Sequence, residues 1–357
     1  MSKADFPIIG AKVKSVTETF DLTNPDSVSK YFEAKTGKEI EIIKKALEKG
    51  NFIAYFVGKK NAGKGTYSKI FSNLIGKDKI VHLSVGDLVR EIHADWDNYI
   101  KGPKGKKLKE FYRGPLEFDE AVERFLGRSA SALLPSEFII AMLRVKFEEL
   151  DGKSVFLDGF PREIDQISAS LYFKEVIGRG NDKDMYVLID IPDSVINERI
   201  KFRRICPKCQ APRNIRLLPT TLVEYDEKND EFYLKCDNPS CDKAVMVGKE
   251  GDDLGIEPIK ERLAKDQQII DKANELSGIP IIRLRNSVPT DVADENFDNY
   301  ELTPGFSFEY DKENKAVKVI ESPWTVEDNK GVKSYSLMPA PVVVGLLKQM
   351  SEVLKEE

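Results

Sequence analysis

The sequence predicts an α/β protein whose core is a mostly parallel β-sheet flanked by helices. Apolar segments of strand length alternate along the chain with segments of helical periodicity, which is typical of parallel strands joined by helices. A glycine-rich stretch, "GKKNAGKGT" at 58–66, lies between the first apolar segment and a helical one. That order is the order of a phosphate-binding loop. The 357 residues suffice for one large domain with insertions or for two domains.

The composition excludes several classes of protein. With 41% hydrophobic and 32% charged residues, the chain can form a packed core. Its 55 Lys and Arg against 60 Asp and Glu give a net charge of −5, which argues against a protein that mainly coats nucleic acid. No apolar run has the length of a signal peptide or of a membrane span. We therefore expect a cytoplasmic protein with no membrane contact.

The first elements in chain order are a helix, a strand, the glycine loop and a second helix. Residues 27–50 have apolar residues at helical spacing and stop at Gly50. Residues 51–57, "NFIAYFV", form a continuous apolar run, which is typical of a buried strand. Residues 66–76 follow the loop with helical spacing. The loop therefore has the flanking elements that phosphate binding requires.

The same alternation continues to the end of the chain. Asp193 begins one of the helical segments, and we expect it to be that helix's N-cap. Further strands are expected at 79–85, 153–160, 184–192 and 279–286. Further helices are expected at 136–152, 193–204, 256–278 and 340–357.

Three segments interrupt this alternation. Residues 94–130 are polar, contain "KGPKGKKLKE" and are expected to form an exposed insertion. Residues 206–241 contain all four cysteines of the chain. Residues 300–336 alternate apolar and polar side chains on either side of "DKEN", which predicts a β-hairpin.

The glycine loop has the residue types that bind phosphate. Glycines let successive N–H groups point inward at anionic oxygens, and the following helix adds its positive N-terminal end. Lys64 brings a mobile positive charge. The general pattern has a hydroxyl directly after the lysine, whereas here Gly65 intervenes before Thr66. A glycine-rich turn with chance lysines is the alternative, and the loop alone indicates only phosphate binding.

Three further segments give the loop a specific context. They are "HLSVGDLVR" at 82–90, "VFLDGFPREIDQ" at 155–166 and "INERIKFRRICPKC" at 196–209. Together with Gly-Lys-Gly-Thr, they resemble the adenylate kinase family of nucleoside monophosphate kinases. The resemblance spans roughly residues 51–90, 133–210 and 250–290. Residues 1–50, about 94–130 and 294–336 have no counterpart in the family.

The resemblance implies a P-loop kinase with a parallel sheet core, an arm that binds the nucleoside monophosphate (NMP) and a zinc-stapled lid. The arm and its insertion would comprise 94–149, and the lid 201–254. An N-terminal extension at 1–50 would precede a core assembled from 51–93, 150–200 and 255–357, with the extra hairpin at about 300–336. We expect a monomer.

The resemblance also implies reversible transfer of a phosphoryl group from ATP to AMP, with Mg²⁺, to give two ADP. This chemistry gathers many negative oxygens, which Mg²⁺ and the planar forks of arginines neutralise. A single arginine is more simply explained as a solvated surface residue. Five arginines, however, fall on family positions: Arg90, Arg162, Arg199, Arg203 and Arg262. The implied catalytic residues are Lys64, Arg162, Arg203 and Arg262.

The implied nucleotide sites extend over several segments. For ATP they are Asn61, Ala62, Gly63, Lys64, Gly65, Thr66, Arg199, Arg203 and Val288. For AMP they are Val85, Arg90, Leu133, Leu134, Gly159, Arg162, Gln166 and Arg262. Asp87 and Asp158 would order the waters of Mg²⁺, and a helix cap is the alternative for Asp87. Neither His82 nor His93 is needed for the chemistry.

The four cysteines are spaced for a metal ion. Cys206 and Cys209 form a C-x₂-C pair, and Cys236 and Cys241 a C-x₄-C pair. Four thiolates suit a structural, tetrahedral Zn²⁺, while two local disulfides or a redox pair are the alternatives. The resemblance supports zinc, because the family's mobile lid lies here and some members staple it with zinc.

The chain departs from the family at four places. Lys60 and Asn61 replace a common Pro and Gly, although Asn tolerates left-handed geometry, and Lys60 adds positive charge as Lys59 does. Glu250 occupies the position of a lid arginine, for which Lys249 is a substitute. Gln166 favours AMP as the acceptor, whereas Val85 replaces a common Thr of that pocket.

Two alternatives follow. The acceptor could be UMP, CMP or another nucleoside monophosphate. A protein of another class would be a non-catalytic zinc ribbon on a kinase-like fold that binds nucleic acid. Against that, residues 200–250 are near charge balance and have no interleaved aromatics for stacking on bases.

Overall fold

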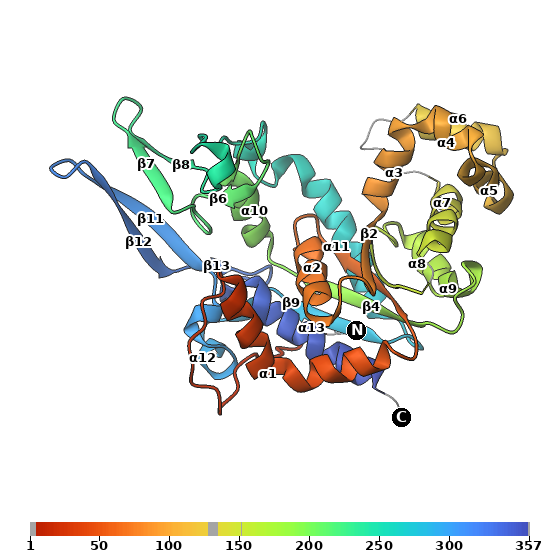
Figure 1. The fold of residues 1–357 in the computed structure, drawn as a ribbon, viewed down its shortest axis with the longest axis horizontal. Coiled ribbons are helices and arrows are strands. Elements are labelled where there is room, and N and C mark those ends of the chain that lie inside the picture. The colour runs from red at the N-terminus through yellow and green to blue at the C-terminus, as the bar shows by residue number, and fades with distance from the viewer. Residues whose placement is uncertain (1–4, 128–134, 151, 356–357) are drawn as a thin grey trace.

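The computed structural model describes residues 5–127, 135–150 and 152–355 and confirms the α/β class (Figure 1). Five parallel strands form the central sheet in the order β2-β3-β1-β4-β9. Their bounds are β1 Phe52–Gly58, β2 Ile80–Ser84, β3 Ser154–Asp158, β4 Lys183–Asp190 and β9 Ile281–Arg285. Each of the five strands predicted from apolar runs is therefore present. Because the strands are parallel, their carboxyl ends meet at one edge, where ligands bind in sheets of this kind.

Strand β1 shows how the sheet becomes the centre of two hydrophobic cores. Phe52 and Phe56 face one core, and the alternate residues Ile53 and Tyr55 face the other. The first core also contains side chains of α1 (Pro25–Ala46), α2 (Lys64–Ile75) and α13 (Pro339–Leu354). The second contains side chains of α3 (Val85–Ala94), α7 (Ser136–Glu149) and α11 (Lys260–Asn274). Both faces of the sheet are thus covered, as a parallel sheet requires.

The helix α10 (Asp193–Lys201) differs from the prediction at its start. Pro192 occupies the N-cap position, and Asp193 is the first helical residue. The expectation that Asp193 caps the helix is therefore wrong. Its carboxylate instead lies 2.7 Å from the ammonium of Lys59 in the glycine loop.

Residues 94–130 were expected to form an exposed insertion, and as far as residue 127 the structure instead has three helices whose apolar side chains join the second core of the sheet. The buried side chains include Trp96, Leu108 and Phe125, which pack toward α7. The lysines of "KGPKGKKLKE" lie on the outer side of these helices, so composition alone concealed the packed face. The helices are α4 (Trp96–Lys101), α5 (Pro103–Phe111) and α6 (Phe118–Leu126).

The cysteine segment forms two small antiparallel ribbons. Their strands are β5 (Arg203–Ile205), β6 (Pro212–Asn214), β7 (Leu222–Asp226) and β8 (Glu231–Lys235). Three of the cysteines, with Leu234 and Met246, form a small separate hydrophobic cluster. Since this cluster is small, the segment needs another source of stability.

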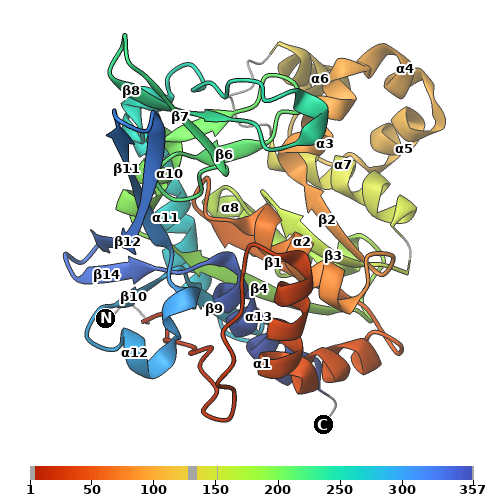
Figure 2. The same ribbon diagram turned by 60° about the vertical axis from the view of Figure 1, so that its left-hand side comes forward.

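The predicted hairpin around "DKEN" is confirmed as β11 (Pro304–Asp311) and β12 (Ala316–Pro323). It lies beside the ribbon β7–β8 in both views (Figures 1 and 2). Tyr310 stacks on Tyr225 with ring centroids 4.4 Å apart, and the N–H of Phe306 donates to the carbonyl of Arg216 at 2.7 Å. The hairpin therefore joins the cysteine segment to the rest of the molecule.

The remaining short elements connect these parts. A second small sheet has the order β10-β14-β13. The bounds are α8 Ile164–Ser170, α9 Phe173–Val176, β10 Ser287–Pro289, α12 Ala293–Asn296, β13 Thr325–Glu327 and β14 Lys333–Ser336. Among the described residues, no helix combines the length and the hydropathy needed to cross a bilayer.

The two ends of the chain pack against each other through α1 and α13. A buried ion pair joins α1 to the segment before the hairpin: the ammonium of Lys35 lies 3.2 Å from the carboxylate of Glu301 and 2.7 Å from that of Asp298. Tyr31 also donates to Glu301, at 2.6 Å. Burial disfavours the charged lysine, but the bonds to Asp298 and Glu301 outweigh it and raise the pKa of Lys35.

Candidate active site

The glycine loop begins where β1 ends and leads into α2. Gly63 has a φ of 99°, and a Cβ at this position would lie 2.7 Å from the ring of Tyr67. Asn61 has a φ of 65°, so the left-handed geometry expected for it is present. The ammonium of Lys64 donates to the carbonyl oxygens of Gly58 at 2.9 Å and Lys59 at 3.2 Å. The loop is thus curled around its own lysine.

Asp158, the last residue of β3, brings a carboxylate to the loop. Its oxygens lie 3.6 Å from the ammonium of Lys64 and 3.8 Å from Nε2 of His82. The other ring nitrogen of His82 shares a 3.0 Å hydrogen bond with Ser68. Burial lowers the pKa of His82, although Asp158 acts in the opposite direction. His82 thus has a hydrogen-bond partner and a carboxylate neighbour within the fold.

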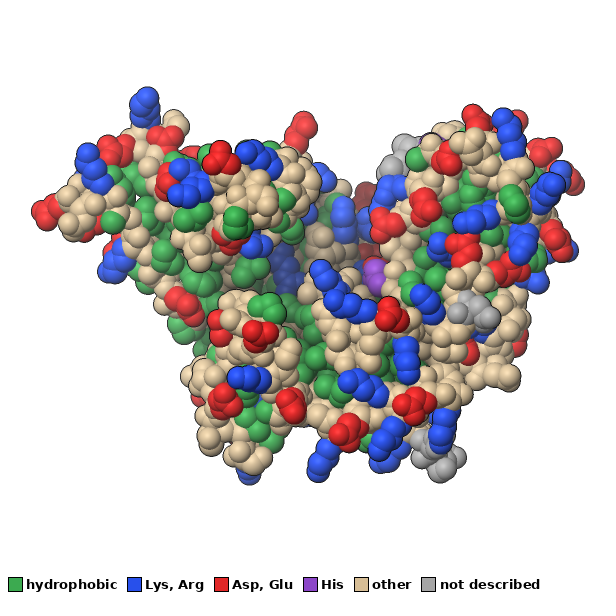
Figure 3. Space-filling view, viewed as in Figure 1, with side chains coloured by type: hydrophobic (Ala, Val, Ile, Leu, Met, Phe, Trp, Pro, Cys, Tyr) green, Lys and Arg blue, Asp and Glu red, His purple; other side chains and the backbone are tan. Residues whose placement is uncertain are grey.

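A cleft of about 1060 Å³ opens at this edge of the sheet. In the space-filling view the molecule is hollowed between the cysteine segment and the helices α3–α6, with Lys and Arg side chains inside the hollow (Figure 3). All six predicted loop residues line the cleft, and so do three predicted residues from elsewhere. These residues are Asn61, Ala62, Gly63, Lys64, Gly65, Thr66, Asp158, Arg199 and Arg203.

Arg199 is positioned by a residue that the sequence did not reveal. Its guanidinium donates to the carbonyl of Asn61 and to Oδ1 of Asn286, both at 3.2 Å. The amide of Asn286, which is fully buried, donates in turn to the hydroxyl of Tyr67 at 2.9 Å. Asn286 follows the last strand of the sheet without any motif around it, so no sequence signal identified it.

Val288, predicted at the ATP site, has a fully buried side chain and does not line the cleft. The wall at this end is formed by Leu337, Met338 and Pro339, which precede and begin α13, and by Leu22 and Thr23, which precede α1. A long insertion separates Val288 from Met338, so the sequence could not show which of the two faces the cleft.

Arg203 is held by a partner in the predicted lid, beyond the cysteine segment. Its guanidinium donates twice to the carboxylate of Asp252, at 2.8 and 2.6 Å. Such a paired contact fixes the plane of the guanidinium. Arg203 is therefore aimed by Asp252, and part of its charge is neutralised in this arrangement.

The arginines Arg162 and Arg262 are brought together by α8 and α11. Burial and the positive charge of Arg162 lower the pKa of Arg262. Asp266, one helical turn after Arg262, accepts a hydrogen bond from the N–H of Lys60 at 3.0 Å. Burial raises the pKa of Asp266, while Lys64 and Arg262 oppose that shift. Two predicted arginines and the glycine loop thus meet on one face of α11.

Four of the residues predicted to bind AMP lie together in the structure. Gln166 is buried, accepts from the N–H of Arg162 at 2.7 Å and donates to Ser136 at 3.1 Å. Gly159 has a φ of 92°, and a Cβ there would lie 3.4 Å from Cβ of Val85. These four predicted residues surround the ends of β2 and β3. Leu133 and Leu134 lie outside the described residues.

Asp87 and Arg90 lie on the exposed side of α3 and form an ion pair with each other. Hydrogen bonds from Ser84 and Arg90 lower the pKa of Asp87, against a rise that burial causes. The N-cap of α3 is Ser84, whose hydroxyl accepts from the N–H of Asp87. The alternative that Asp87 caps the helix is therefore wrong.

The four cysteines form one cluster. Their sulfur atoms lie within 4.8 Å of one another, and those of Cys209 and Cys236 are 3.8 Å apart. A tetrahedral site with Zn–S bonds of about 2.3 Å separates its sulfurs by about 3.8 Å, whereas a disulfide needs about 2.05 Å. The N–H groups of Cys209 and Lys208 lower the pKa of Cys206 to about 6, whereas burial and the neighbouring thiols raise the pKa of Cys241 to about 12. The cluster therefore fits a metal ion.

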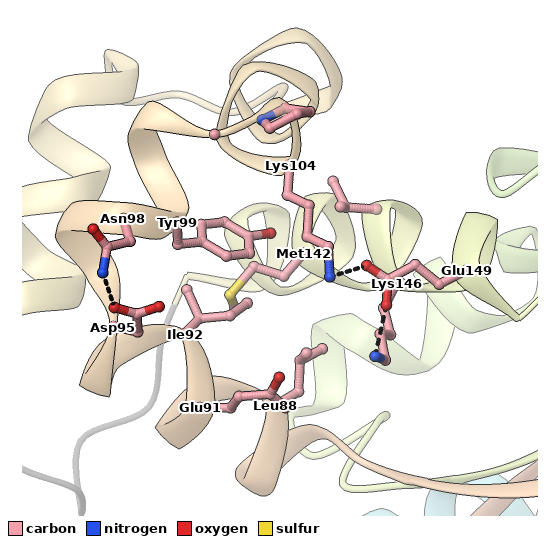
Figure 4. Close-up of a pocket in the computed structure, with 13 residues that line it drawn as sticks. Leu88, Glu91, Ile92, Asp95, Asn98, Tyr99, Lys104, Met142, Lys146 and Glu149 are labelled. Carbon is pink, nitrogen blue, oxygen red and sulfur yellow. Dashed lines mark hydrogen bonds and ion pairs between the residues drawn. The ribbon is translucent and has the colours of Figure 1, made fainter.

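A second cavity, of about 330 Å³, lies between α3, α4, α5 and α7 (Figure 4). Ile92 and Met142 contribute to its apolar lining. At its edge, Glu149 pairs with both Lys104 and Lys146. The cavity shares α3 with the predicted monophosphate site but contains none of the predicted site residues.

Comparison with curated proteins finds many similar adenylate kinases. The chain is 31% identical over 223 residues to the adenylate kinase of Thermotoga petrophila, an alignment that covers 60% of this chain and 82% of that protein. It is 31% identical over 208 residues to the adenylate kinase of Clostridium novyi, covering 58% of this chain and 77% of that protein. No protein-family model matches the chain.

Proposed function

The chain belongs to the adenylate kinase family and is a nucleoside monophosphate kinase, and we propose that it transfers a phosphoryl group reversibly from ATP to AMP, giving two ADP. One observation carries the proposal. The glycine loop lines a single cleft together with Asp158, Arg199 and Arg203, which come from two other segments. A glycine-rich turn without a binding role would not be expected to lie among charged side chains from other segments.

In this proposal the donor triphosphate lies along the glycine loop. The loop N–H groups, the N-terminal end of α2 and Lys64 bind its phosphate oxygens. Arg199, aimed by Asn286, lies against the base, and the wall of Leu337, Met338 and Pro339 encloses it. Arg203 leaves Asp252 and binds the transferred group when the lid closes.

The residues at the end of β3 fit a magnesium ion bound with ATP. The carboxylate of Asp158 and the hydroxyl of Thr66 line the same cleft, and hard oxygen ligands are those that Mg²⁺ prefers. When bound, Mg²⁺ neutralises charge on the phosphate oxygens. Asp158 would order its waters, with Asp87 as the second predicted carboxylate.

The acceptor monophosphate lies between α3 and the start of α8. Arg90 and Arg162 bind its phosphate, and Arg262 lies between acceptor and donor. The presence of glutamine at position 166 favours AMP as the acceptor. The side chain of Gln166 also accepts a hydrogen bond from the backbone N–H of Arg162. No general base is required, because the acceptor oxygen is already anionic. It attacks the γ-phosphorus while the bond to the leaving ADP oxygen breaks.

We further propose the predicted division into an arm at 94–149, a lid at 201–254 and a core from the other segments, with Zn²⁺ held by the four cysteines. Arm and lid close over the substrates, which excludes water from the reaction. The zinc would be structural, since four thiolates leave no open position. A cytoplasmic monomer acting on ATP and AMP remains the prediction.

The test is a coupled assay with ATP, Mg²⁺ and each of AMP, UMP, CMP and GMP. We expect ADP formation with the highest kcat/KM for AMP and a loss of at least about 100-fold in Lys64→Met. Preference for UMP or CMP would identify another acceptor. No activity with AMP, together with salt-sensitive RNA or DNA binding that Lys64→Met leaves unchanged, would support the non-catalytic alternative.

A further inference from the structure

The glycine loop contains two adjacent lysines that the structure treats differently. The side chain of Lys59 is only 3% exposed and pairs with Asp193 at 2.7 Å. Lys60 is exposed, and among the residues that the structure describes it has no ion-pair partner. The charge of Lys59 is therefore used within the fold, whereas that of Lys60 is available to a ligand.

The backbone of Lys60 is fixed beside the helix that carries Arg262. Its N–H donates to the carboxylate of Asp266 at 3.0 Å, and Asp266 is one turn after Arg262 on α11. Residues four apart lie on the same face of a helix. Lys60 thus projects from the loop at the face of α11 where two of the predicted catalytic arginines meet.

The charges near Lys60 are mainly positive, although the carboxylate of Asp266 accepts a hydrogen bond from its N–H. Burial lowers the pKa of Lys60, and four cations from other segments lower it further: Arg262, Lys249, Arg203 and Arg162. Gathering like charges costs free energy unless an anion neutralises them. A protein keeps such a cluster where multiply charged phosphates bind.

The other cations near Lys60 are less directly available to a phosphoryl group. Arg203 is bound to Asp252 in the described arrangement. The neighbouring Lys249 belongs to the lid, so its position depends on lid closure. Lys60 belongs to the loop itself and is in place before closure.

We propose that Lys60 is a further catalytic residue, whose ammonium binds the phosphoryl group in transfer. This inference rests on the proposed function. Lys60 stays protonated throughout and donates hydrogen bonds to phosphoryl oxygens. It breaks and forms no covalent bond, so its effect is on the charge of the transition state.

The first experiment compares Lys60→Met and Lys60→Arg with wild type. We expect kcat to fall on the order of 10-fold or more in Lys60→Met, with smaller changes in both KM values. Lys60→Arg should retain most of the activity, because it keeps the charge. Lys77→Met is the matched control, since Lys77 is an exposed lysine in the turn after α2. It should behave as wild type.

The second experiment measures binding of a bisubstrate analogue, two adenosines joined by five phosphates, and of ATP. Lys60→Met should weaken the analogue by a larger factor than ATP, because only the analogue places phosphates along the whole transfer path. A merely structural role would lower the thermal midpoint and weaken both ligands alike.

The outcomes separate the two proposals. Wild-type kcat and analogue affinity in Lys60→Met would overturn the role of Lys60 and leave the proposed function standing. A wild-type protein that phosphorylates no monophosphate would overturn both. If wild type prefers another acceptor, the same variants are compared with that acceptor, and the same fall in kcat is expected.

Discussion

Two glycines of the phosphate loop face opposite structural demands. Gly63 has left-handed geometry and no room, since a Cβ would lie 2.7 Å from the Tyr67 ring. Gly65 has negative φ, and the nearest atom to its Cβ would be Nε2 of His82 at 3.9 Å. The first glycine is therefore required by the fold. At Gly65 the fold leaves room for a side chain, so a requirement for glycine there comes from a ligand that binds the loop in the cleft.

This contrast predicts the stability of two variants. Gly63→Ala should lower the free energy of unfolding by about 1–3 kcal/mol, because it adds backbone strain and displaces Tyr67. It should also weaken ATP binding, since Tyr67 holds Asn286, which aims Arg199. Gly65→Ala should unfold within about 0.5 kcal/mol of wild type. Urea titration of both variants measures the difference, and equal midpoints would contradict the argument.

Individual site residues could be predicted from the sequence where they belong to a motif. The loop residues, Asp158 and Arg199 were predicted because each stands at a fixed distance from a recognisable neighbour. Asn286 and Met338 were not, because they meet the loop only through folding across insertions. The pairing of Arg203 with Asp252 was hidden for the same reason.

If the cysteines hold zinc as proposed, the cysteine segment is the element whose stability depends most on a ligand. Its hydrophobic cluster is small, and three of its members are cysteines. A structural zinc ion contributes roughly 10–16 kcal/mol in small fingers, which exceeds what such a cluster provides.

Zinc removal should therefore unfold this segment and leave the core intact. Treatment with a chelator, or Cys209→Ser, should expose 206–241 to limited proteolysis and abolish kinase activity, while the main thermal transition persists. Metal analysis should find about one zinc per chain before treatment and none after. Ser240→Ala, an exposed neighbour of Cys241, is the control and should keep both metal and activity. Full activity of zinc-free protein would refute the role.

The hairpin β11–β12 tethers the cysteine segment at a second place. Tyr310 stacks on Tyr225 and donates to Glu227 at 2.7 Å, and Phe308 packs against Phe232. If the cysteine segment closes as a lid, the hairpin β11–β12 either moves with it or loses its contacts with it.

Loosening this contact should alter lid closure. Tyr310→Ala removes an aromatic pair that contributes about 0.5–1.5 kcal/mol, and we expect faster amide exchange in β7 and β8. The KM for ATP should rise by roughly 2- to 5-fold if closure becomes less favourable. Glu309→Ala, on the opposite face of the same strand, is the control. Unchanged exchange in β7 and β8 would show that the stack does not restrain the lid.

At the element scale, strands were predicted more completely than the helices of the arm. A buried parallel strand is a continuous apolar run, which few other structures imitate. The helices α4 to α6 combine lysine-rich outer faces with a few large buried side chains such as Trp96 and Phe125. The overall composition of the segment does not separate these two faces, so composition alone predicts an exposed insertion.

A buried charge pair joins α1 to the segment that precedes the hairpin. Lys35 comes from α1, and Glu301 lies between α12 and the hairpin; both are almost fully buried. Removing one partner of a buried pair leaves the other charge without compensation. No sequence pattern relates residues this far apart, so the contact could not be predicted.

Glu301→Gln should therefore destabilise the protein by about 3–5 kcal/mol, as broken buried pairs do. The double variant Lys35→Met with Glu301→Gln should recover part of that loss, because no buried charge remains. Glu295→Gln, an exposed residue nearby, should leave the denaturation midpoint unchanged. Guanidinium titration measures all three. A single variant as stable as wild type would mean that the pair contributes little.

The packing of α1 against α13 also has a consequence for synthesis. Tyr31, Phe32 and Ile43 of α1 are buried partly by α13, which begins only at Pro339. At about 5–20 residues per second, a ribosome needs roughly 15–60 s to add the residues between the two helices. During that time the nascent first helix has no final partner. The described fold can be completed only after α13 has been translated.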